Sequence, residues 1–460
     1  MSLRTQVMRG GTFLVLRQGL GVIISLGGVL LLTRTIGPEK YGLYIATYNI
    51  FWYLQTISQL GIEVYIVRRE GEENSETYHQ AFTLLLFLGL GGMLLSLLGL
   101  PLLNGWVRLE GFGAVAQVMF LGLPVVLLSQ VPLARLERHL DYRRVAMVEL
   151  SGQIVFFIVT LPLAFQGLGV WAPVAGWWTQ QLQTLGLLYW MSSYRPRFYW
   201  DLGLVKQMLS YSVGFSASFW VWQLRILVNP LVIGRYAGAE AVGYVALAIR
   251  IVEVLSFVKT ATWRLAIATL GRLQRDTARL KKAVTEGMGL QILALGPLLV
   301  GFSWVGPWLI PLLFGSRWRP VIEIYPFIAV SYLSNAMFNL HSSALYVLQR
   351  NWEITVFHLA HIALFGGAVF MFVPRLGLVG YGWAEILALC SYIIIHFYVT
   401  RSIGSPDYRL VGLWWGAFVA ALFIYQLGWW AALGLVTIVL LPNTHQRIFS
   451  YFKSLRSREA

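Results

Sequence analysis

Charged residues are scarce in this sequence of 460 residues. Asp, Glu, Lys and Arg together make up only 12% of it, whereas 57% of the residues are hydrophobic. The mean hydropathy is +0.66, and an ordinary soluble domain carries roughly a quarter charged residues. The shortage of charge excludes a typical water-soluble protein and predicts a chain whose main solvent is lipid.

Cysteine and aspartate are nearly absent. The single cysteine, Cys390, excludes a disulfide framework and a cysteine-rich metal site, and its apolar neighbours predict a small buried residue. The four aspartates, at positions 141, 201, 276 and 407, form no Asp-x-Asp pair, and the sequence has no phosphate-binding P-loop. These absences argue against a glycosyltransferase, a polymerase or an ATP-driven pump. We therefore expect no enzyme activity, no cofactor and no metal.

Long apolar runs recur along the whole chain and leave no room for a separate soluble domain. A spanning helix needs roughly 20 mostly apolar residues. We place spans at residues 13–33, 43–66, 80–103, 113–134, 146–166, 169–191, 208–233, 241–268, 284–313, 324–348, 354–373, 377–400, 410–426 and 428–442. The predicted fold is thus all-α with about fourteen transmembrane helices, or twelve if the short last pair forms an interfacial hairpin.

The net charge of +15 does not indicate nucleic-acid binding, because the 35 Lys and Arg residues form no basic domain and lie scattered between the apolar runs. If the N-terminus is cytoplasmic, the cytoplasmic segments carry about 23 of these residues and the opposite segments about seven. Positive residues accumulate on the cytoplasmic side of membrane proteins. We therefore predict a multi-pass protein of a prokaryotic cytoplasmic (inner) membrane, surrounded by membrane lipids, with both termini in the cytoplasm.

Two segments of the chain resemble each other. Residues 33–44 (TRTIGPEKYGLY) and 234–245 (GRYAGAEAVGYV) share the pairs Arg34/Arg235, Gly37/Gly238, Glu39/Glu240 and Gly42/Gly243 in register. Each segment follows one apolar run and opens the next. The residues suit a tight corner between two helices, in which the first glycine ends one helix and Pro38, or Ala239 at the matching position, begins the next.

A second pair of similar segments supports an internal repeat. Residues 167–177 (GLGVWAPVAGW) and 375–383 (RLGLVGYGW) each introduce the sixth span of one half of the chain. We therefore divide the chain into an N-terminal lobe (1–200), a C-terminal lobe (201–404), and a C-terminal helix pair with a basic tail (405–460). Because six spans is an even number, the two lobes should be related by a pseudo-two-fold axis along the membrane normal.

Several short segments carry a family resemblance. They are RTIGPEKYGLY (34–44), QLGIEVYIVRRE (59–70), IGRYAGAEAVGYVALAIRI (233–251), LFGSRW (313–318) and GLVGYGWAEI (377–386). In this order they resemble the polysaccharide transporters of the multidrug/oligosaccharidyl-lipid/polysaccharide (MOP) exporter superfamily, the family of O-antigen and capsule repeat-unit flippases. The resemblance implies two helical lobes around a central cavity, alternating access, and a lipid-linked glycan as the cargo. We expect a monomer to be sufficient.

Five cationic residues fall inside predicted spans, where charge is costly and is a functional candidate by default. They are Arg17, Arg225, Arg250, Lys259 and Arg264. An undecaprenyl-type diphosphate carries about two negative charges, and guanidinium groups bind phosphates through paired hydrogen bonds at any cellular pH. We therefore predict that these residues line the cavity, with Arg17, Arg225 and Arg250 as the best substrate-binding candidates.

Each cation also has a plainer interpretation. Arg17 could reach the interface or pair with a carboxylate. Arg250 could pair with Glu253, which lies three residues further on the same helix face and is itself a cavity candidate. Lys259 and Arg264 could be interfacial. The sequence leaves these alternatives open.

Two acids could couple transport to an ion gradient. Glu63 and Glu385 fall within or beside spans and could carry a coupling proton or cation, or could simply be satisfied by neighbouring helices. A multidrug exporter of the same superfamily should have an acidic site for cationic cargo, whereas cations outnumber evident acids here. A flippase for a lipid II-type precursor also uses a cationic cavity and remains an alternative. A scaffold protein would need neither paired lobes nor buried arginines.

Overall fold

The protein is helical throughout. The computed structural model describes residues 3–69, 74–257, 270–271, 273–442 and 444–446. Helices make up 89% of the structure, and the described residues contain no strand. Seven helices are long and apolar enough to cross a membrane. The prediction of an all-α membrane protein is therefore confirmed.

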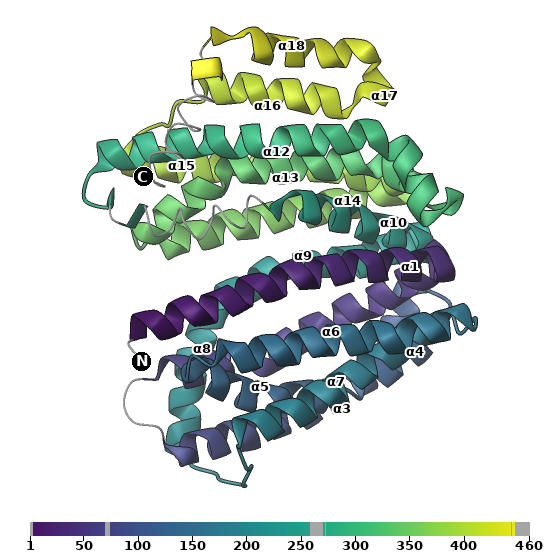
Figure 1. The fold of residues 1–460 in the computed structure, drawn as a ribbon, viewed down its shortest axis with the longest axis vertical. Coiled ribbons are helices and arrows are strands. Elements are labelled where there is room, and N and C mark those ends of the chain that lie inside the picture. Colours follow the sequence, from purple (N-terminus) through teal and green to yellow (C-terminus); the bar gives the residue numbers. More distant parts are fainter. Residues whose placement is uncertain (1–2, 70–73, 258–269, 272, 443, 447–460) are drawn as a thin grey trace. The chain divides into compact units, whose positions relative to one another are not determined.

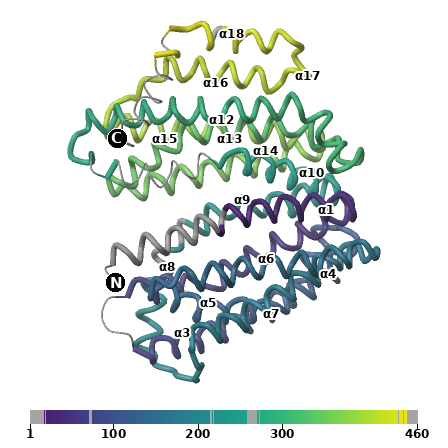
Figure 2. The backbone as a smooth tube through the Cα atoms, in the orientation of Figure 1, coloured from purple at the N-terminus to yellow at the C-terminus, as the bar shows by residue number. Residues whose placement is uncertain are grey.

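Most described residues of the predicted spans are helical, with short breaks such as those at Leu60–Gly61 and Leu121–Gly122 (Figures 1 and 2). The first half of the chain forms α1 (Leu3–Gln59), α2 (Ile62–Arg68), α3 (Ser75–Val107), α4 (Phe112–Phe120), α5 (Leu123–Arg138), α6 (Tyr142–Phe165), α7 (Trp171–Ser192), α8 (Leu202–Gln223), α9 (Arg225–Val228), the π-helix η1 (Asn229–Ile233) and α10 (Gly234–Leu255). The second half forms α12 (Thr277–Phe314), η2 (Ser316–Trp318), α13 (Pro320–Val347), α14 (Asn351–Ala388), η3 (Leu389–Ser391), α15 (Tyr392–Ile403), α16 (Arg409–Leu422), α17 (Ile424–Leu427), η4 (Trp429–Ala432) and α18 (Leu433–Leu440).

The chain divides into two compact units. The first comprises Met1–Ala246, Leu313–Trp318 and Val373–Leu378, and the second comprises Leu247–Leu312, Arg319–Phe372 and Val379–Ala460. In the first unit α6 lies between α1 and α7, and it packs along both (Figure 1). This unit extends past residue 200 because α8 packs on α2, where the rings of Tyr65 and Tyr211 meet edge to face at 5.8 Å.

Glycines form the sharp corners that the repeat predicted. Gly37 breaks α1 with φ 76° and ψ 173°, and Gly238 breaks α10 with φ 84° and ψ 176°. A positive φ is costly for residues that carry a Cβ, which explains glycine at both positions. Gly169 and Gly377, the matching glycines of the second repeated motif, also share their φ values of 56° and 57°. Gly37 and Gly238 therefore adopt the same backbone conformation, and Gly169 and Gly377 share a positive φ.

The two corners of the first repeat pack against each other reciprocally. A Cβ built on Gly42 would lie 1.8 Å from the carbonyl oxygen of Ala239, and one built on Gly243 would lie 2.5 Å from the carbonyl oxygen of Pro38. Pro38 and Ala239 occupy matching positions of the repeat, as do the two glycines. The contact therefore has local two-fold symmetry, and each glycine is needed for the close approach of two backbones.

Arginines fix the ends of both corners. Arg34 donates to the carbonyl of Leu313 at 3.3 Å, and Arg235 donates to the carbonyl of Trp106 at 2.6 Å. These carbonyls end α12 and α3, which correspond to the third span of each half. Trp318 is 1% exposed beside them and donates to the carbonyl of Thr33 at 3.3 Å. Each arginine satisfies carbonyls that a helix end leaves without an intrahelical partner.

In the second unit, the C-terminal helices pack on α12. Ser303 donates to the carbonyl of Leu422 at 2.8 Å, and Trp304 donates to that of Ala421 at 3.0 Å. α16 and α18 lie side by side (Figure 1). The expectation that Cys390 is buried was wrong, because its side chain is exposed in η3. An apolar segment of a membrane protein can face lipid, so apolar neighbours in sequence do not ensure burial.

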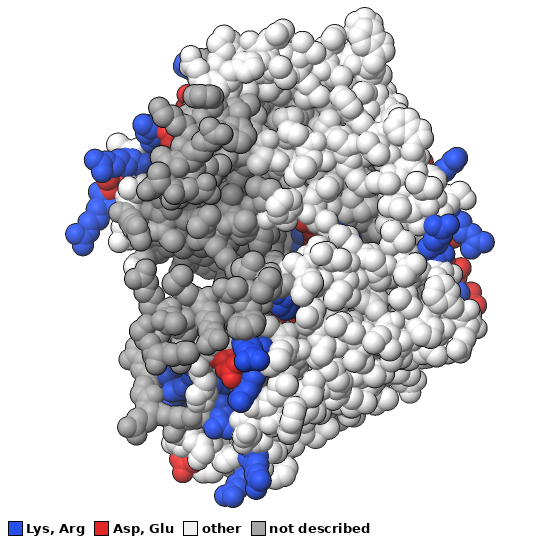
Figure 3. All heavy atoms as spheres, in the orientation of Figure 1, with Lys and Arg blue, Asp and Glu red and all other residues white. Residues whose placement is uncertain are grey.

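Charged side chains lie mainly near helix ends. On the face drawn in Figure 3, blue and red residues gather towards the two ends of the helices, and the described surface between them is almost entirely uncharged. This distribution matches an apolar band that contacts lipid, flanked by two polar ends.

Candidate functional site

Arg17 of α1 forms an ion pair with Glu149 of α6. Its Nε lies 2.9 Å from Glu149 Oε2, and each side chain is 37% exposed. One turn further along both helices, Gln153 donates to the carbonyl of Gly21 at 2.7 Å. Two polar contacts therefore join α1 to α6 inside predicted spans. Pairing offsets part of the cost of holding the guanidinium away from water.

Glu149 is a residue that the sequence analysis missed. It lies inside the predicted span 146–166, so the criterion that selected Arg17 also applied to it. Glu137 of α5 lies close enough to interact electrostatically with both Glu149 and Glu63. The first unit thus holds three interacting acids on α2, α5 and α6, and one of them is paired with Arg17.

Glu63 lies in the first turn of α2. Its Oε2 atom is buried and has no hydrogen-bond partner among the described residues. Gly61, directly before α2, closely approaches α8, since a Cβ there would lie 2.1 Å from Ser216 Oγ. The Glu63 carboxylate therefore lies close to the tightly packed junction of α2 and α8, and its Oε2 atom can still accept a hydrogen bond.

Arg225 lies at a break in the seventh predicted span. α8 ends at Gln223, α9 contains only Arg225–Val228, and the π-helix η1 follows with Pro230. Asn229 in η1 is buried, and its Oδ1 has no hydrogen-bond partner in the part of the chain that the structure describes. π-Helical segments occur frequently at functional sites, and irregular backbone at membrane depth is tolerated where it lines a cavity. The half-buried Arg225 side chain therefore starts an irregular, polar stretch of an apolar helix.

The remaining candidates lie in the second unit or outside the described residues. Arg250 Nη1 lies 3.6 Å from Glu253 Oε2 within α10, and Tyr332 of α13 donates to Glu253 Oε1 at 3.4 Å. Glu385 is fully buried in α14. Lys259 and Arg264 lie outside the residues that the structure describes. The structure thus contains the Arg250–Glu253 ion pair that was the predicted alternative to a role in the cavity for these two residues.

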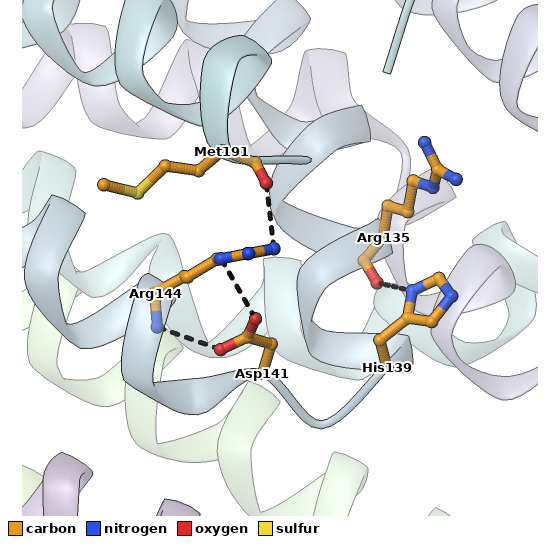
Figure 4. A network of polar contacts seen from close by, with 5 residues as sticks. All are labelled: Arg135, His139, Asp141, Arg144 and Met191. Atoms are coloured by element: carbon orange, nitrogen blue, oxygen red, sulfur yellow. Dashed lines mark hydrogen bonds and ion pairs between the residues drawn. The ribbon is translucent and has the colours of Figure 1, made fainter. Parts of the chain in front are cut away.

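Arginines at one end of the first unit bind carbonyls at helix ends. Arg135 donates to Ser192, Arg138 to Ile66 and Arg144 to Met191, each at 3.1 Å. Figure 4 shows Arg144 bridging the carbonyl of Met191 and the carboxylate of Asp141, with the His139 ring bonded to the Arg135 carbonyl. These residues belong to the side with the charge excess, so part of that excess stabilises the C-terminal ends of α2 and α7.

Replacing Arg144 with alanine should lower the free energy of unfolding by about 1 kcal/mol, because a charge-assisted hydrogen bond between two helices is lost. The chain offers a matched control in Arg279, which pairs with Asp276 through the same Asp-x-x-Arg geometry, with Nε–Oδ2 distances of 3.2 Å there and 3.3 Å in the Asp141–Arg144 pair. Thermal unfolding of purified protein should show a clear loss for Arg144→Ala and almost none for Arg279→Ala. Equal losses would mean that the bond to Met191 adds no stability.

The sequence matches a family model over residues 31–323, and the model describes a polysaccharide biosynthesis protein. A succinoglycan biosynthesis transport protein, ExoT of Rhizobium meliloti, is 25% identical over 311 residues, which cover 65% of this chain and 61% of ExoT. The lipopolysaccharide biosynthesis protein WzxC of Escherichia coli is 22% identical over 424 residues, which cover 90% of this chain and 85% of WzxC.

A solved structure has a similar fold. The lipid II flippase MurJ, in an inward closed conformation, superposes with a TM-score of 0.70 at 13% identity, covering 96% of this chain and 99% of the MurJ chain. At this level of identity the likeness shows the fold alone. It agrees with the family resemblance found in the corner motifs, and the resemblance itself is confirmed by the family match.

Proposed function

Because the chain belongs to the family of polysaccharide biosynthesis proteins, we propose that it is a flippase that moves an undecaprenyl-diphosphate-type oligosaccharide across the cytoplasmic membrane. The observation that carries this proposal is the arginine at position 17, inside an apolar helix and only partly exposed. The biosynthesis and transport roles in the names of ExoT and WzxC agree with such a cargo. MurJ, which has a similar fold, is a flippase for lipid II, another lipid-linked intermediate.

In this proposal, Arg17 and Arg225 bind the diphosphate. A diphosphate offers several oxygens that accept hydrogen bonds, and a guanidinium group presents donors in a fixed planar fork that matches them. When cargo enters, Arg17 would exchange its contact with Glu149 for one with a phosphate. Without cargo, the ion pair with Glu149 would compensate the charge of Arg17. Arg250 would be available in the same way when its weak contact with Glu253, at 3.6 Å, opens.

We propose alternating access between an N-terminal lobe (1–200) and a C-terminal lobe (201–404), with residues 405–460 as an accessory helix pair and tail. The matching conformations of Gly37 and Gly238, and the reciprocal contact of Gly42 and Gly243, support an internal repeat of this kind. The excess of Lys and Arg supports cytoplasmic termini and places these corners on the periplasmic side. Opening and closing of the corner contact would then control release to the outer leaflet.

An ion could drive the cycle through Glu63 or Glu385. The unsatisfied Oε2 of Glu63 favours Glu63, because it leaves an acceptor for a proton or a cation. A monomer would suffice, since both lobes belong to one chain. The partners in this proposal are the lipid-linked glycan, the surrounding lipids and a coupling ion, without nucleic acid.

Purified wild-type protein in proteoliposomes should flip a fluorescent lipid-diphosphate oligosaccharide and leave a cationic dye in place. The reason is that the proposed cargo contacts, Arg17, Arg225 and Arg250, are cationic and suit an anionic headgroup. The measurement is the fraction of headgroups that become accessible to an impermeant quencher, compared with protein-free liposomes. Lipid II should be included as a third cargo.

Each other outcome would point to a different member of the superfamily. Transport of the dye alone would contradict the flippase proposal and support a multidrug exporter. Transport of lipid II in preference to the oligosaccharide would assign the peptidoglycan precursor as the cargo.

A further inference from the structure

The connection between α7 and α8 forms a strap, residues 193–201, that lies along α3. The Tyr194 hydroxyl donates to the carbonyl of Tyr78 at 3.1 Å, the Tyr199 N–H donates to Thr83 Oγ1 at 3.1 Å, and the Asp201 N–H donates to Gln80 Oε1 at 2.6 Å. Burial raises the pKa of Tyr194, so its hydroxyl remains a donor at cellular pH. These bonds hold the backbone of the strap in place at several points.

The sequence of the strap explains why it stays extended. Pro196 fixes its own φ, lacks an N–H, and disfavours a helical conformation at Arg195. Asp201 then accepts from the N–H of Leu204 at 2.6 Å and caps α8. The strap therefore has a defined backbone conformation, because Pro196 restricts its first part and the Asp201 cap of α8 fixes its last residue.

An aromatic groove lies between the strap and α3. It is an open depression of about 610 Å³, lined by Thr83, Phe87, Phe198, Tyr199 and Trp200. The Phe87 ring meets the Trp200 ring edge to face at 5.8 Å. The Phe198 side chain is 74% exposed, and the Trp200 side chain is 52% exposed. Such a groove is open to its surroundings, apolar, and of a size that suits a hydrocarbon chain.

Two cations of the strap precede the groove residue Phe198 in the sequence. Arg195 and Arg197 are exposed, and among the described residues neither forms a hydrogen bond or an ion pair. This separates them from Arg135, Arg138 and Arg144 at the same end of the unit, which are bound to carbonyls. The nearby Asp201 is engaged as a helix cap. The free guanidinium groups of the strap therefore remain available for an anion.

The groove continues into an apolar stripe on α3. Leu90, Leu94, Leu98 and Leu102 follow Phe87 at helical spacing on one face, and all four are exposed, Leu102 by 82%. A stripe of this kind within a membrane helix faces hydrocarbon. A molecule that fills the groove therefore has a charged contact at one end and lipid-facing surface at the other.

We propose that the strap and α3 form a binding site for one anionic phospholipid, with the headgroup phosphate on Arg195 and Arg197 and an acyl chain in the groove. Aromatic rings with arginines beside them are typical of the membrane interface, where they contact headgroups and chains at once. With the proposed orientation the lipid belongs to the inner leaflet. The site is independent of the cargo that the protein transports.

Native mass spectrometry of the purified chain with dioleoyl phosphatidylglycerol and dioleoyl phosphatidylcholine tests the site. Wild type should bind the first phosphatidylglycerol about tenfold more tightly than phosphatidylcholine, because two cations meet one anion. The double variant Arg195→Gln/Arg197→Gln should lose this preference, and Arg195→Lys/Arg197→Lys should keep most of it. Trp200→Ala should weaken the binding of both lipids, since it removes a wall of the groove.

Matched controls separate the site from general surface effects. Arg275→Gln/Arg279→Gln removes two exposed cations at the N-terminal end of α12, one before the helix and one in its first turn, and Trp352→Ala removes a tryptophan that is 73% exposed elsewhere. Both variants should bind lipid as wild type does. A phosphatidylglycerol with a photoreactive diazirine in its acyl chain should crosslink to wild type within residues 78–102 or 193–205, a result that does not depend on any variant folding.

Two results would overturn the proposal. One is a preference for phosphatidylglycerol that is as strong in Arg195→Gln/Arg197→Gln as it is in the control variant Arg275→Gln/Arg279→Gln. The other is crosslinking of wild type only outside the strap and α3, which would leave the aromatic surface as a contact for a protein partner.

Discussion

Arg17→Ala should lower the rate of oligosaccharide flipping by about thirtyfold or more, the effect expected when a partly exposed charge that binds a phosphate is removed. The variant also leaves Glu149 without its ion-pair partner, so the loss alone would not distinguish a binding role from a structural one. The measurement is the initial flipping rate in proteoliposomes that contain equal amounts of folded protein.

The double variant Arg17→Ala/Glu149→Gln resolves this ambiguity. Removing both charges avoids an unpaired acid within the span, so stability should return towards wild type. If Arg17 binds the diphosphate, flipping should stay low in the double variant, whereas Glu149→Gln alone should retain most of the activity. Recovery of flipping in the double variant would show that Arg17 only neutralises Glu149. Arg225→Ala gives an independent test at the break between α8 and α9.

Gly42→Ala should lower the free energy of unfolding by about 1–3 kcal/mol, the usual cost of overpacking. It should also reduce flipping about tenfold by shifting the population away from the closed corner. The added Cβ would lie 1.8 Å from a backbone oxygen, so relief requires movement of the backbone and not only of a side chain. Gly243→Ala should have a smaller effect of the same kind, since its distance is 2.5 Å. Thermal unfolding and the flipping assay measure both variants.

Gly91→Ala serves as the control for the corner. A Cβ at Gly91 in α3 would have no atom within 4 Å, so this change should leave stability equal or slightly higher. The double variant Gly42→Ala/Gly243→Ala should lose less than the sum of the single losses, because both substitutions open one contact. Additive losses, or corner variants that behave like Gly91→Ala, would contradict a shared closed corner.

The helices and corners could be predicted from the sequence because each depends on residues that are close together in the chain. Apolar runs form membrane helices, and glycines adopt the positive φ of a corner. The apolar runs predicted the helices, and the repeated glycines predicted the corners at Gly37 and Gly238, because a positive φ strongly favours glycine. The family resemblance had partly the same origin, since two of its five motifs contain those corners.

The contacts between helices could not be predicted in the same way. Arg17 stood out as a charge in an apolar run, but its pairing with Glu149 depends on the packing of α1 on α6, which hydropathy does not contain. In the sequence, the strap is only a short polar segment between two predicted spans. Its aromatic groove forms because the strap runs along α3, a path set by buried hydrogen bonds of Thr83 and Gln80.

The contact between the two corners also has a bearing on ancestry. In an isologous dimer, residue i of one subunit touches residue j of the other, and j touches i in return. Gly42 with Ala239, and Gly243 with Pro38, reproduce that arrangement inside one polypeptide. A half-length ancestor with a single corner could have made the same contact by pairing with its own copy. Gene fusion would then have freed the two corners to diverge, as Pro38 and Ala239 at matching positions indicate, while the glycines at 42 and 243 stayed the same.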